Sequence, residues 1–587
     1  MKILGIVTQH LRKEEFQEAT KILKRRDNET VSYFSIGSFH FASVSHPHEH
    51  FLIYETNESF FYVYTDQVYK EIIKKKAKLN TIQEIFEDLK EFNPFIIQFE
   101  KKENRISLLS DYFGVRTIFH TQIDREFCFS TEKKSIVSYY GKRRFKIDRE
   151  GLIELLLFQF QWGKRTIIEE ISILEPRIIL NFNFTESALS YNTYAQFPNE
   201  TVKELNLELL KSIDSYFGSY FSKLNSNGYN LVLLSGGLDS RYILEWLAKS
   251  SIKVNKIINF GPDYIPDVTF AKNIVSHFGL NPVYENYVIN ADIIVKYSKK
   301  HIYINEGYSG HINSHLLYSL EKLDENSNYI FFDGYLGDII LGGSYSTRVL
   351  GDLYSSLKFD VKYLLRALSE PFKNEIQDYI SADFEELVSS RYNKDDRKAR
   401  KLEHMIYDNY GRRHAMMGGP KISEDFGLVH KPFFNRTFFD KTYLIPIELR
   451  AKHQVYKRII DEFHEEIKDY PSTSLLVKSK KESQLKKHYK RFRLLFFRAL
   501  ERIIKISIIK PDNYVDPNTW LRKNNNYRDF VMNNITSKEI EQKDLFNVSE
   551  IHKMLKEHLN YKHNFGFLFA RILDIVLTLQ LFTDYEK

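Results

Sequence analysis

The chain has 587 residues, more than one hydrophobic core can organise, so we expect two or more domains. Its 43% hydrophobic and 27% charged residues are typical of a soluble globular protein, and its single cysteine, Cys128, excludes a disulfide framework and a cysteine-based zinc site. The net charge of +7 arises in residues 478–510, which carry twelve lysines and arginines but only two glutamates. Because the rest of the chain has no excess of positive charge, we expect no nucleic-acid partner.

Residues 1–200 contain short apolar runs separated by turn signals, such as 31–36, 59–64 and 94–99. Short strands with two helical stretches between them indicate a layered domain that contains antiparallel sheet.

Within this region, Ser110-Asp-Tyr-Phe-Gly-Val-Arg116 followed by Phe127-Cys-Phe-Ser-Thr-Glu-Lys133 resembles the N-terminal glutaminase domain of asparagine synthetases. The resemblance implies an Ntn-hydrolase-like domain with αββα layers. That family uses a cysteine at the mature N-terminus as its nucleophile, whereas position 2 is Lys2 here and Cys128 lies in a predicted strand. We therefore expect no glutaminase activity, and a nitrogen source that is either ammonia or an amine already on the substrate.

From residue 205 to 345, apolar strands alternate with helical patterns, which predicts a parallel, doubly wound sheet with the ligand at the carboxyl ends of its strands. The strand 231–234 is followed by Ser235-Gly-Gly-Leu-Asp-Ser240 and then by a helix. A glycine turn before a helix N-terminus is typical of an anion site. Because Asp239 in that turn would repel a bare phosphate, the pattern indicates a bridging Mg²⁺.

This turn resembles the pyrophosphate loop of the N-type ATP pyrophosphatases, and with its preceding leucine it is similar to the asparagine synthetase branch. The resemblance implies that residues 201–587 form an α/β domain of the HUP type, helical from about residue 350, in which ATP is split to AMP and pyrophosphate. The residues implied to bind ATP in this turn are Ser235, Gly236, Gly237, Asp239 and Ser240.

Two further strand ends continue the resemblance. Strand 256–260 ends at Phe260-Gly261, an edge that contacts the adenine in the family, although an ordinary glycine at a strand end would give the same pattern. The segment Tyr329-Ile-Phe-Phe-Asp-Gly-Tyr-Leu-Gly-Asp338 resembles the second nucleotide motif of asparagine synthetases. This implies that Asp333 and Gly334 contact the nucleotide, and that Asp338 is a second metal ligand beside Asp239.

Tyr335 stands where asparagine synthetases have a glutamate, and its surroundings resemble β-lactam synthetase and lasso-peptide cyclases. In β-lactam synthetase the tyrosine, paired with a carboxylate, deprotonates the attacking amine, because a tyrosine alone is too weak a base near neutral pH. Glu370 and Glu403 are the two candidates for that carboxylate. The alternative is an aromatic residue that packs over the adenine or in the core.

Residues 301–315 line the acceptor pocket in relatives, and Glu306 could bind a substrate amine there. His311 and His315 are four residues apart, but without a third ligand we expect no zinc.

Beyond residue 350 the pattern is mainly helical. Lys480, with Lys478 as the other option, stands where the family places a catalytic lysine that neutralises developing negative charge. Residues 486–510 form a basic amphipathic pattern, which favours either peripheral membrane contact or a helix with one packed and one solvated face.

Together these patterns predict a carbon–nitrogen ligase that uses ATP and Mg²⁺ to activate a small-molecule or peptide carboxylate as an acyl-adenylate for an amine, in natural-product or peptide modification. The alternatives are an ammonia-dependent asparagine synthetase and a non-catalytic nucleotide-binding regulator. The apolar stretch 565–582 is interrupted by Arg571 and Asp574 and indicates a buried helix. With no membrane span and no signal peptide expected, we predict a cytoplasmic protein, for which a homodimer is one option.

Overall fold

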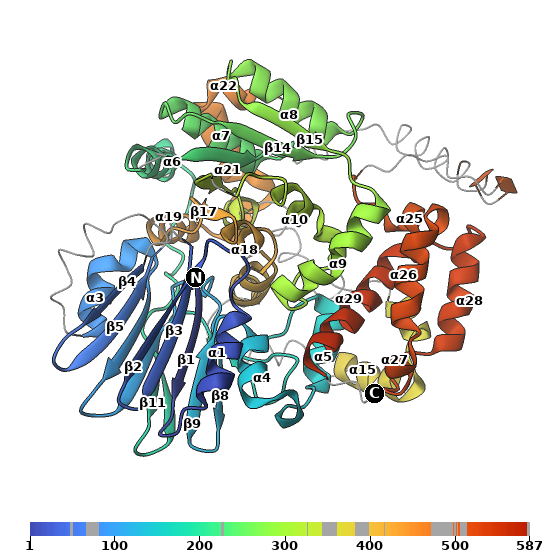
Figure 1. Ribbon diagram of the computed structural model, residues 1–587. Helices are drawn as coiled ribbons and strands as arrows, with labels where there is room; N and C mark the ends of the chain where they lie inside the picture. The colour runs from blue at the N-terminus through green and yellow to red at the C-terminus, as the bar shows by residue number, and fades with distance from the viewer. Residues whose placement is uncertain are drawn as a thin grey trace.

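The computed structural model describes residues 1–46, 51–65, 81–224, 228–325, 327–342, 361–381, 398–415, 417–470, 497, 500–501, 503–504 and 513–583. Figure 1 shows the N-terminal sheets in blue to teal, the parallel sheet with its helices in green to orange-brown, and a group of C-terminal helices in red.

The N-terminal domain holds two antiparallel sheets of six strands each. The first sheet has the order β10 (Ser172–Ile173), β8 (Phe119–Ile123), β9 (Glu126–Ser130), β1 (Lys2–Val7), β3 (Phe39–Ser45), β2 (Thr30–Ile36). The second has the order β12 (Ala188–Thr193), β11 (Ile178–Asn183), β7 (Arg105–Leu109), β6 (Phe95–Glu100), β5 (Ser59–Tyr64), β4 (Phe51–Glu55).

The inner faces of these two sheets pack on one another through aromatic side chains. Phe39 of β3 stacks on Phe99 of β6 with 5.1 Å between ring centroids, and Phe41 approaches Tyr62 of β5 at 5.2 Å. The outer faces are covered by helices: α1 (Lys13–Lys21) and α4 (Lys133–Tyr140) on the first sheet, α3 (Ile82–Leu89) on the second. Because strand side chains alternate between faces, the full burial of β1 and β5 means that the inner strands of both sheets are covered on both sides. The four layers confirm the predicted αββα fold.

The second part is built on a five-stranded parallel sheet. Its order is β15 (Val283–Tyr287), β14 (Lys256–Phe260), β13 (Tyr229–Leu233), β16 (Tyr329–Phe332), β17 (Gly427–His430). The chain runs from β13 outward to β15 and then returns to β16 on the other side of β13, so the strand order reverses between β13 and β16. In sheets of this kind a ligand binds in the crevice at such a reversal.

Helices cover both faces of the parallel sheet, which confirms the predicted doubly wound architecture. Val232 and Ile330 pack toward one layer and Leu231 and Phe331 toward the other. The first layer contains α6 (Leu207–Ser222), α7 (Leu238–Lys249), α8 (Pro266–His277), α19 (Arg436–Tyr443) and α21 (Gln454–Phe463). The second contains α9 (Ala291–Asn305), α10 (His315–Leu320) and α18 (Gly419–Glu424).

The C-terminal helices pack against α9 and against α5 (Arg149–Phe158). Among them are α14 (Val361–Arg366), α15 (Glu370–Ser381), α25 (Pro517–Lys523), α26 (Asn525–Ile535), α27 (Lys538–Glu541), α28 (Val548–Leu559) and α29 (Gly566–Phe582). The apolar stretch 565–582 is the buried helix α29, as predicted, and Arg571 on it donates to the carbonyls of Leu156 and Leu157 at the end of α5. Among the described helices, none has the length and apolarity that a membrane crossing requires.

Lys478 and Lys480 lie outside the described residues, as does most of the predicted basic helix 486–510. Their roles therefore stay predictions.

Candidate active site

The turn between β13 and α7 carries the Ser-Gly-Gly sequence, and its backbone amides are already bonded. The N–H of Ser235 donates to Ser240 Oγ (3.1 Å), that of Gly236 to Asp267 Oδ1 (2.8 Å), and that of Gly237 to Ser235 Oγ (3.2 Å). We expected these amides to be open to an anion; instead nearby hydroxyl and carboxylate oxygens compete for them. A phosphate therefore has to displace these bonds or bind at the first turn of α7, where the helix dipole attracts anions.

The loop after β16 lies directly against this turn. A Cβ atom at Gly334 would lie 2.9 Å from Cβ of Asp239, and one at Gly337 would lie 2.7 Å from Asp239 Cγ. The N–H of Asp338, in the short helix α11 (Gly337–Ile340), donates to Asp239 Oδ2 at 3.0 Å. Two loops about a hundred residues apart thus meet at the reversal of strand order.

The electrostatics of this meeting point fit a divalent cation. Burial, and then the negative charge of Asp338, raise the pKa of Asp239 to about 8, and burial raises the pKa of Asp333 to about 6. His453 Nδ1 lies 3.3 Å from Asp338 Oδ1. Mg²⁺ favours a few carboxylates together with phosphate oxygens, so Asp239 and Asp338 form a suitable donor pair. Among the described residues, including those of this site, no group of three or more His, Cys, Asp or Glu side chains is arranged to hold a metal ion.

Both carboxylates open into a cavity of about 590 Å³, a volume typical of small-molecule sites. Its described lining residues are Leu233, Ser235, Asp239, Ser240, Phe260, His301, Ser309, Asn313, His315, Leu316, Asp333, Gly334, Tyr335, Leu336, Asp338, Ile339, Gly419, Ile422 and Tyr514. This lining contains three aspartates and, within the described residues, neither lysine nor arginine.

Phe260 lines the cavity at the end of β14, as the adenine-contact prediction requires. Its ring packs edge-on against His315 at 4.7 Å and tilted against Tyr514 at 5.9 Å. Gly261 is not one of the described residues that line the cavity. It has φ +122°, and a Cβ atom at this position would lie 2.4 Å from Ile265 Cδ1. The backbone conformation and the lack of space for a side chain thus require glycine at position 261, and its contact with adenine stays a prediction.

Tyr335 lines the same cavity, and its N–H donates to Asp333 Oδ1 at 2.9 Å. Neither glutamate suggested as its partner is among the described lining residues. Glu370 is exposed on α15 and pairs with Lys373 at 3.1 Å, while Glu403, on α17 (Lys398–Met405), is buried in an ion pair with Arg450. Both carboxylates thus have cationic partners outside the cavity, and the pairing of Tyr335 with Glu370 or Glu403 stays a prediction.

A further part of the cavity wall comes from α9 and the connection to α10, and its described lining residues are neutral. Burial lowers the pKa of His301 to about 3 and that of His315 to about 4, so both imidazoles are uncharged at pH 7. His301 Nε2 lies 3.2 Å from Ser309 Oγ, and His315 Nε2 lies 3.2 Å from the hydroxyl of Tyr514. This wall therefore offers neutral donors and acceptors.

Glu306, which we expected to bind a substrate amine, faces away from this wall. Its side chain is buried, and its carboxylate accepts from the N–H groups of Lys134 (2.8 Å) and Lys133 (3.1 Å) in the N-terminal domain. The expectation was wrong because these contacts occupy the carboxylate.

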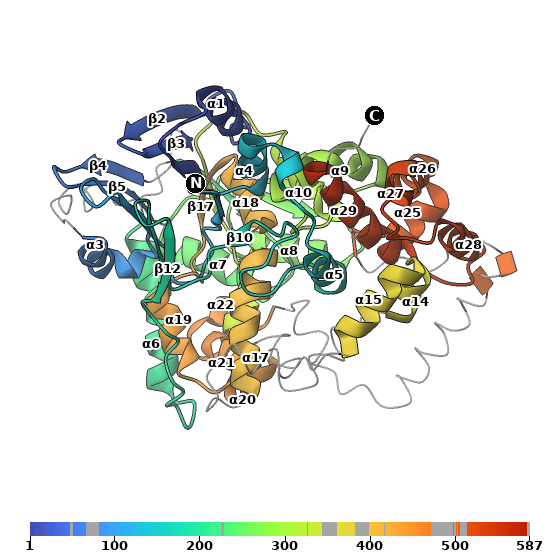
Figure 2. The same ribbon diagram turned by 90° about the horizontal axis from the view of Figure 1, so that it is seen from below.

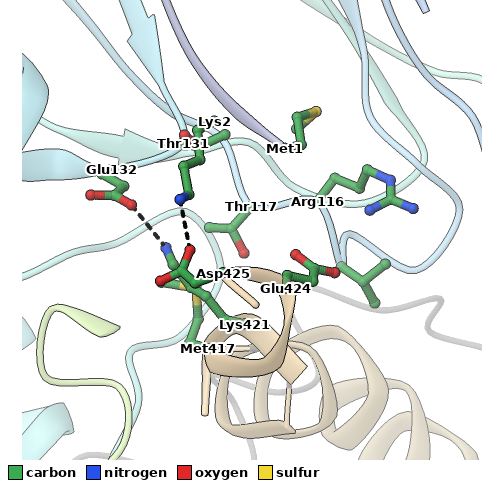
Figure 3. Close-up of a pocket in the computed structure, with 11 residues that line it drawn as sticks. Met1, Lys2, Arg116, Thr117, Thr131, Glu132, Met417, Lys421, Glu424 and Asp425 are labelled. Atoms are coloured by element: carbon green, nitrogen blue, oxygen red, sulfur yellow. Dashed lines mark ion pairs between the residues drawn. The ribbon is translucent and has the colours of Figure 1, made fainter. Parts of the chain in front are cut away.

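A second, smaller cavity of about 40 Å³ lies where the start of β1 meets α18 (Figure 3). Lys2 pairs with Asp425 at 2.8 Å and Lys421 with Glu132 at 3.8 Å. No thiol lines this cavity within the described residues. Cys128 lies in β9, fully buried, and burial raises the pKa of its thiol well above the usual value. The absence of glutaminase activity stays a prediction that these positions support.

Asp267 and His453 contact the two loops of the site, although no sequence motif marks either residue. Asp267 follows the carboxyl end of β14, next to β13, so strand order could have placed it near the turn. His453 arrives from a segment more than a hundred residues after Asp338, and no local pattern predicts its contact.

Such a doubly wound sheet, with a glycine turn and facing carboxylates at the reversal of strand order, defines a nucleotide-binding α/β domain, here joined to an αββα domain. The asparagine synthase family model matches residues 223–582, more than half of the chain, and the glutamine amidotransferase domain model matches residues 76–195. The chain therefore belongs to the asparagine synthase family. The boundary near residue 200 stays a prediction.

Asparagine synthetase [glutamine-hydrolyzing] 1 of Bacillus subtilis (strain 168) is 25% identical to the chain over 180 residues, which cover 30% of this chain and 27% of that relative. The match thus spans about a quarter of the relative's length.

Two solved structures are also similar. Glutamine phosphoribosylpyrophosphate amidotransferase from B. subtilis, complexed with ADP and GMP, gives a TM-score of 0.22 at 8% identity over 60% of this chain and 77% of that chain. An allosteric regulatory enzyme of purine biosynthesis gives 0.24 at 9% identity over 60% and 78%. TM-scores of this size establish no common architecture.

Proposed function

We propose that the protein is an ATP-dependent carbon–nitrogen ligase. A substrate carboxylate attacks the α-phosphorus of ATP, which gives an acyl-adenylate and pyrophosphate, and an amine then displaces AMP to form an amide. The observation that carries the proposal is a single cavity that joins the Ser235–Ser240 turn to the carboxylates of Asp239 and Asp338. Family membership supports the same reaction class.

The residues of this cavity take distinct roles in the proposal. Asp239 and Asp338 would hold Mg²⁺, which supplies positive charge to the triphosphate when it is bound. Ser235, Ser240 and Gly334 border the phosphates, and the N-terminus of α7 stabilises negative charge that develops on them. Phe260 packs against the adenine. Tyr335 contacts the attacking amine, and Lys480, outside the described residues, completes the charge stabilisation.

The character of the cavity supports a substrate other than aspartate. Aspartate would bring a second carboxylate into a space with three aspartates and, among the described lining residues, no cationic side chain. The neutral wall of His301, Ser309 and His315 suits amide and hydroxyl groups instead. We therefore propose a modified amino acid or peptide carboxylate, as in natural-product or peptide modification.

The second candidate is a glutamine-hydrolysing asparagine synthetase. The amidotransferase match and the printed name of the B. subtilis relative favour it. Against it are the cavity's charge and the lack of a thiol among the described residues beside the start of β1.

Exchange of labelled pyrophosphate into ATP tests these proposals, because adenylation is reversible and needs only the carboxylate substrate. We expect exchange with peptides or modified amino acids and none with aspartate alone. Aspartate-dependent exchange, together with release of ammonia from glutamine, would instead establish the second candidate. Nucleotide binding without exchange for any carboxylate would favour a regulator and overturn both.

A further inference from the structure

The segment that joins α9 to α10, residues 306–314, lies between the cavity and the N-terminal domain. Ser309 and Asn313 on this segment line the cavity, and His315 follows it. Figures 1 and 2 show α9 beside α29, which also contacts α4 of the N-terminal domain. Residues 306–314 thus contact two helices that are distant in sequence, α4 and α29, on the side away from the cavity.

On one side the support is Glu306. This residue ends α9 in a left-handed conformation, with φ 54° and ψ 34°. Its carboxylate accepts the first backbone N–H groups of α4, those of Lys133 and Lys134, and the ammonium groups of the same two lysines lie at 3.7 and 3.9 Å. An anion at a helix N-terminus with two charge-assisted bonds is a directional contact.

Neighbouring contacts strengthen this junction. The ammonium of Lys133 lies 4.1 Å from the ring centroid of Tyr308 and 4.6 Å from that of Phe119, a residue of β8. All three side chains are buried. The backbone of the segment is thus held two residues away from Glu306 as well.

On the other side the support is α29. Asp574 Oδ1 lies 2.7 Å from both the backbone nitrogen and Nδ1 of His311. Gly310 lies so close that a Cβ there would be 2.5 Å from Asp574 Oδ2, and a Cβ at Gly307 would be 2.2 Å from Thr578 Oγ1. The segment has no space to shift toward α29.

We infer that Glu306 is a positioning residue through which the N-terminal domain fixes the wall formed by Ser309, Asn313 and His315. The domain then supports recognition of the carboxylate substrate by holding this wall in place, whether or not the domain handles glutamine. This inference rests on the proposed function for its kinetic consequence, while its structural consequence is independent of it.

The test compares the full-length protein with its Glu306→Gln variant, which keeps the shape but cannot accept both N–H groups as an anion. We expect faster hydrogen–deuterium exchange in residues 306–315 and unchanged exchange at the Ser235–Ser240 turn. In pyrophosphate exchange, KM for the carboxylate should rise by at least about tenfold, because misplaced binding groups weaken substrate positioning. KM for ATP should change less than about twofold.

The matched control is Asp440→Asn. It also removes a carboxylate that joins the two parts of the chain, since Asp440 Oδ1 accepts from the hydroxyl of Tyr112 at 3.0 Å, but neither residue lines the cavity. It should leave both KM values unchanged. If Glu306→Gln fails to fold, Glu306→Asp replaces it, because it keeps the charge and shortens the reach.

Unchanged hydrogen exchange in residues 306–315, or an equal rise of both KM values, would overturn the inference. If the wild-type protein supports no exchange with any carboxylate, the proposed function fails, and hydrogen exchange alone decides the role of Glu306.

Discussion

Asp239 is the side chain on which both loops of the site converge, and its charge is unfavourable in the folded protein without a cation. Replacing it by asparagine removes a metal ligand but retains an oxygen that can accept from the N–H of Asp338. We expect Asp239→Asn to lower pyrophosphate exchange at saturating Mg²⁺ by at least about 100-fold, a loss typical of metal sites. The melting temperature of the nucleotide-free protein should not fall, because the charge lost is one that burial opposes.

Asp263→Asn is the matched control for this prediction, because Asp263 lies on an exposed loop beyond β14 and pairs with Lys272. It should retain full exchange. Full exchange in Asp239→Asn as well would show that the metal is held elsewhere.

Gly337 tests the close approach of the two loops. An alanine Cβ would lie 2.7 Å from Asp239 Cγ and 2.8 Å from Phe433 Cζ, so one loop has to move. Overpacking of this kind typically costs about 1–3 kcal/mol. We expect Gly337→Ala to lower the free energy of unfolding by that amount and to reduce exchange, measured by urea unfolding and by the pyrophosphate assay.

Gly218→Ala is the corresponding control, since Gly218 lies inside α6 and a Cβ there meets only the Trp246 ring, at 3.2 Å. It should leave exchange unchanged. Wild-type exchange and stability in Gly337→Ala would contradict the tight contact between the loops.

At the scale of elements, the sequence predicted what local chemistry determines. The β13–turn–α7 unit, the strand ends at Phe260 and Asp333, and the buried helix over 565–582 follow from periodicity, glycines and flanking charge. Those predictions succeed because each depends only on residues that are close to one another in the sequence.

Contacts between distant segments could not be predicted in this way. A carboxylate near a pocket motif such as Glu306 has the same local pattern whether it faces a substrate or caps a helix of another domain. The bond from the Gly236 N–H to Asp267, and the ion pairs of Glu403 with Arg400 and Arg450, likewise depend on tertiary packing. Local sequence therefore identifies candidate groups but not their partners.

The contact between β1 and α18 is an element-scale junction with a measurable contribution. Asp425 pairs at 2.8 Å with both Lys2 and Arg25, and all three side chains are at most about a tenth exposed. Their attraction lowers the pKa of Asp425, although burial opposes it. Asp425→Asn leaves two buried cations short of negative charge, so we expect a loss of about 3 kcal/mol in the free energy of unfolding at pH 7.

Urea unfolding measures this loss, with Asp263→Asn as the exposed-carboxylate control, which should not move the midpoint. A stability of Asp425→Asn equal to that of the wild type would mean that Glu29 and Glu132, the other carboxylates bonded to Lys2 and Arg25, suffice for the junction.

Over the whole molecule, the two parts of the chain are joined by charged contacts on several sides. Arg177 of the N-terminal domain pairs with Asp408 at 2.7 Å, Glu306 accepts from α4, and Asp425 binds β1 and the segment after α1. We infer that the αββα domain holds the parallel-sheet domain in one geometry.

Acid should destabilise the whole molecule through histidines that the fold buries in neutral form. Burial lowers the pKa of His120 to about 4, and those of His404 and His558 to about 3. Above pH 6.5, the ordinary value, neither the folded nor the unfolded chain protonates them, and their contribution is complete. Below pH 6.5 the unfolded chain binds protons that the folded chain excludes, so stability falls toward pH 4, by up to about 1.4 kcal/mol per pH unit for each histidine.

A substitution at His558 measures the contribution of one histidine to this loss of stability in acid. Its Nδ1 accepts from the N–H of Phe565 at 2.9 Å, and Nε2 lies 3.0 Å from the carbonyl of Asn518, so protonation of Nδ1 breaks a bond that a buried amide needs. Urea unfolding at pH 7.5 should show His558→Gln to be less stable than the wild type. Between pH 6.5 and 4.5 the variant should lose stability less steeply, by up to about 1.4 kcal/mol per pH unit. His552→Gln, at an exposed position of the same helix, should keep the wild-type slope. An unchanged slope in His558→Gln would mean that other titrating groups cause the loss of stability in acid. It would contradict the view that the C-terminal helices require a neutral imidazole at this position.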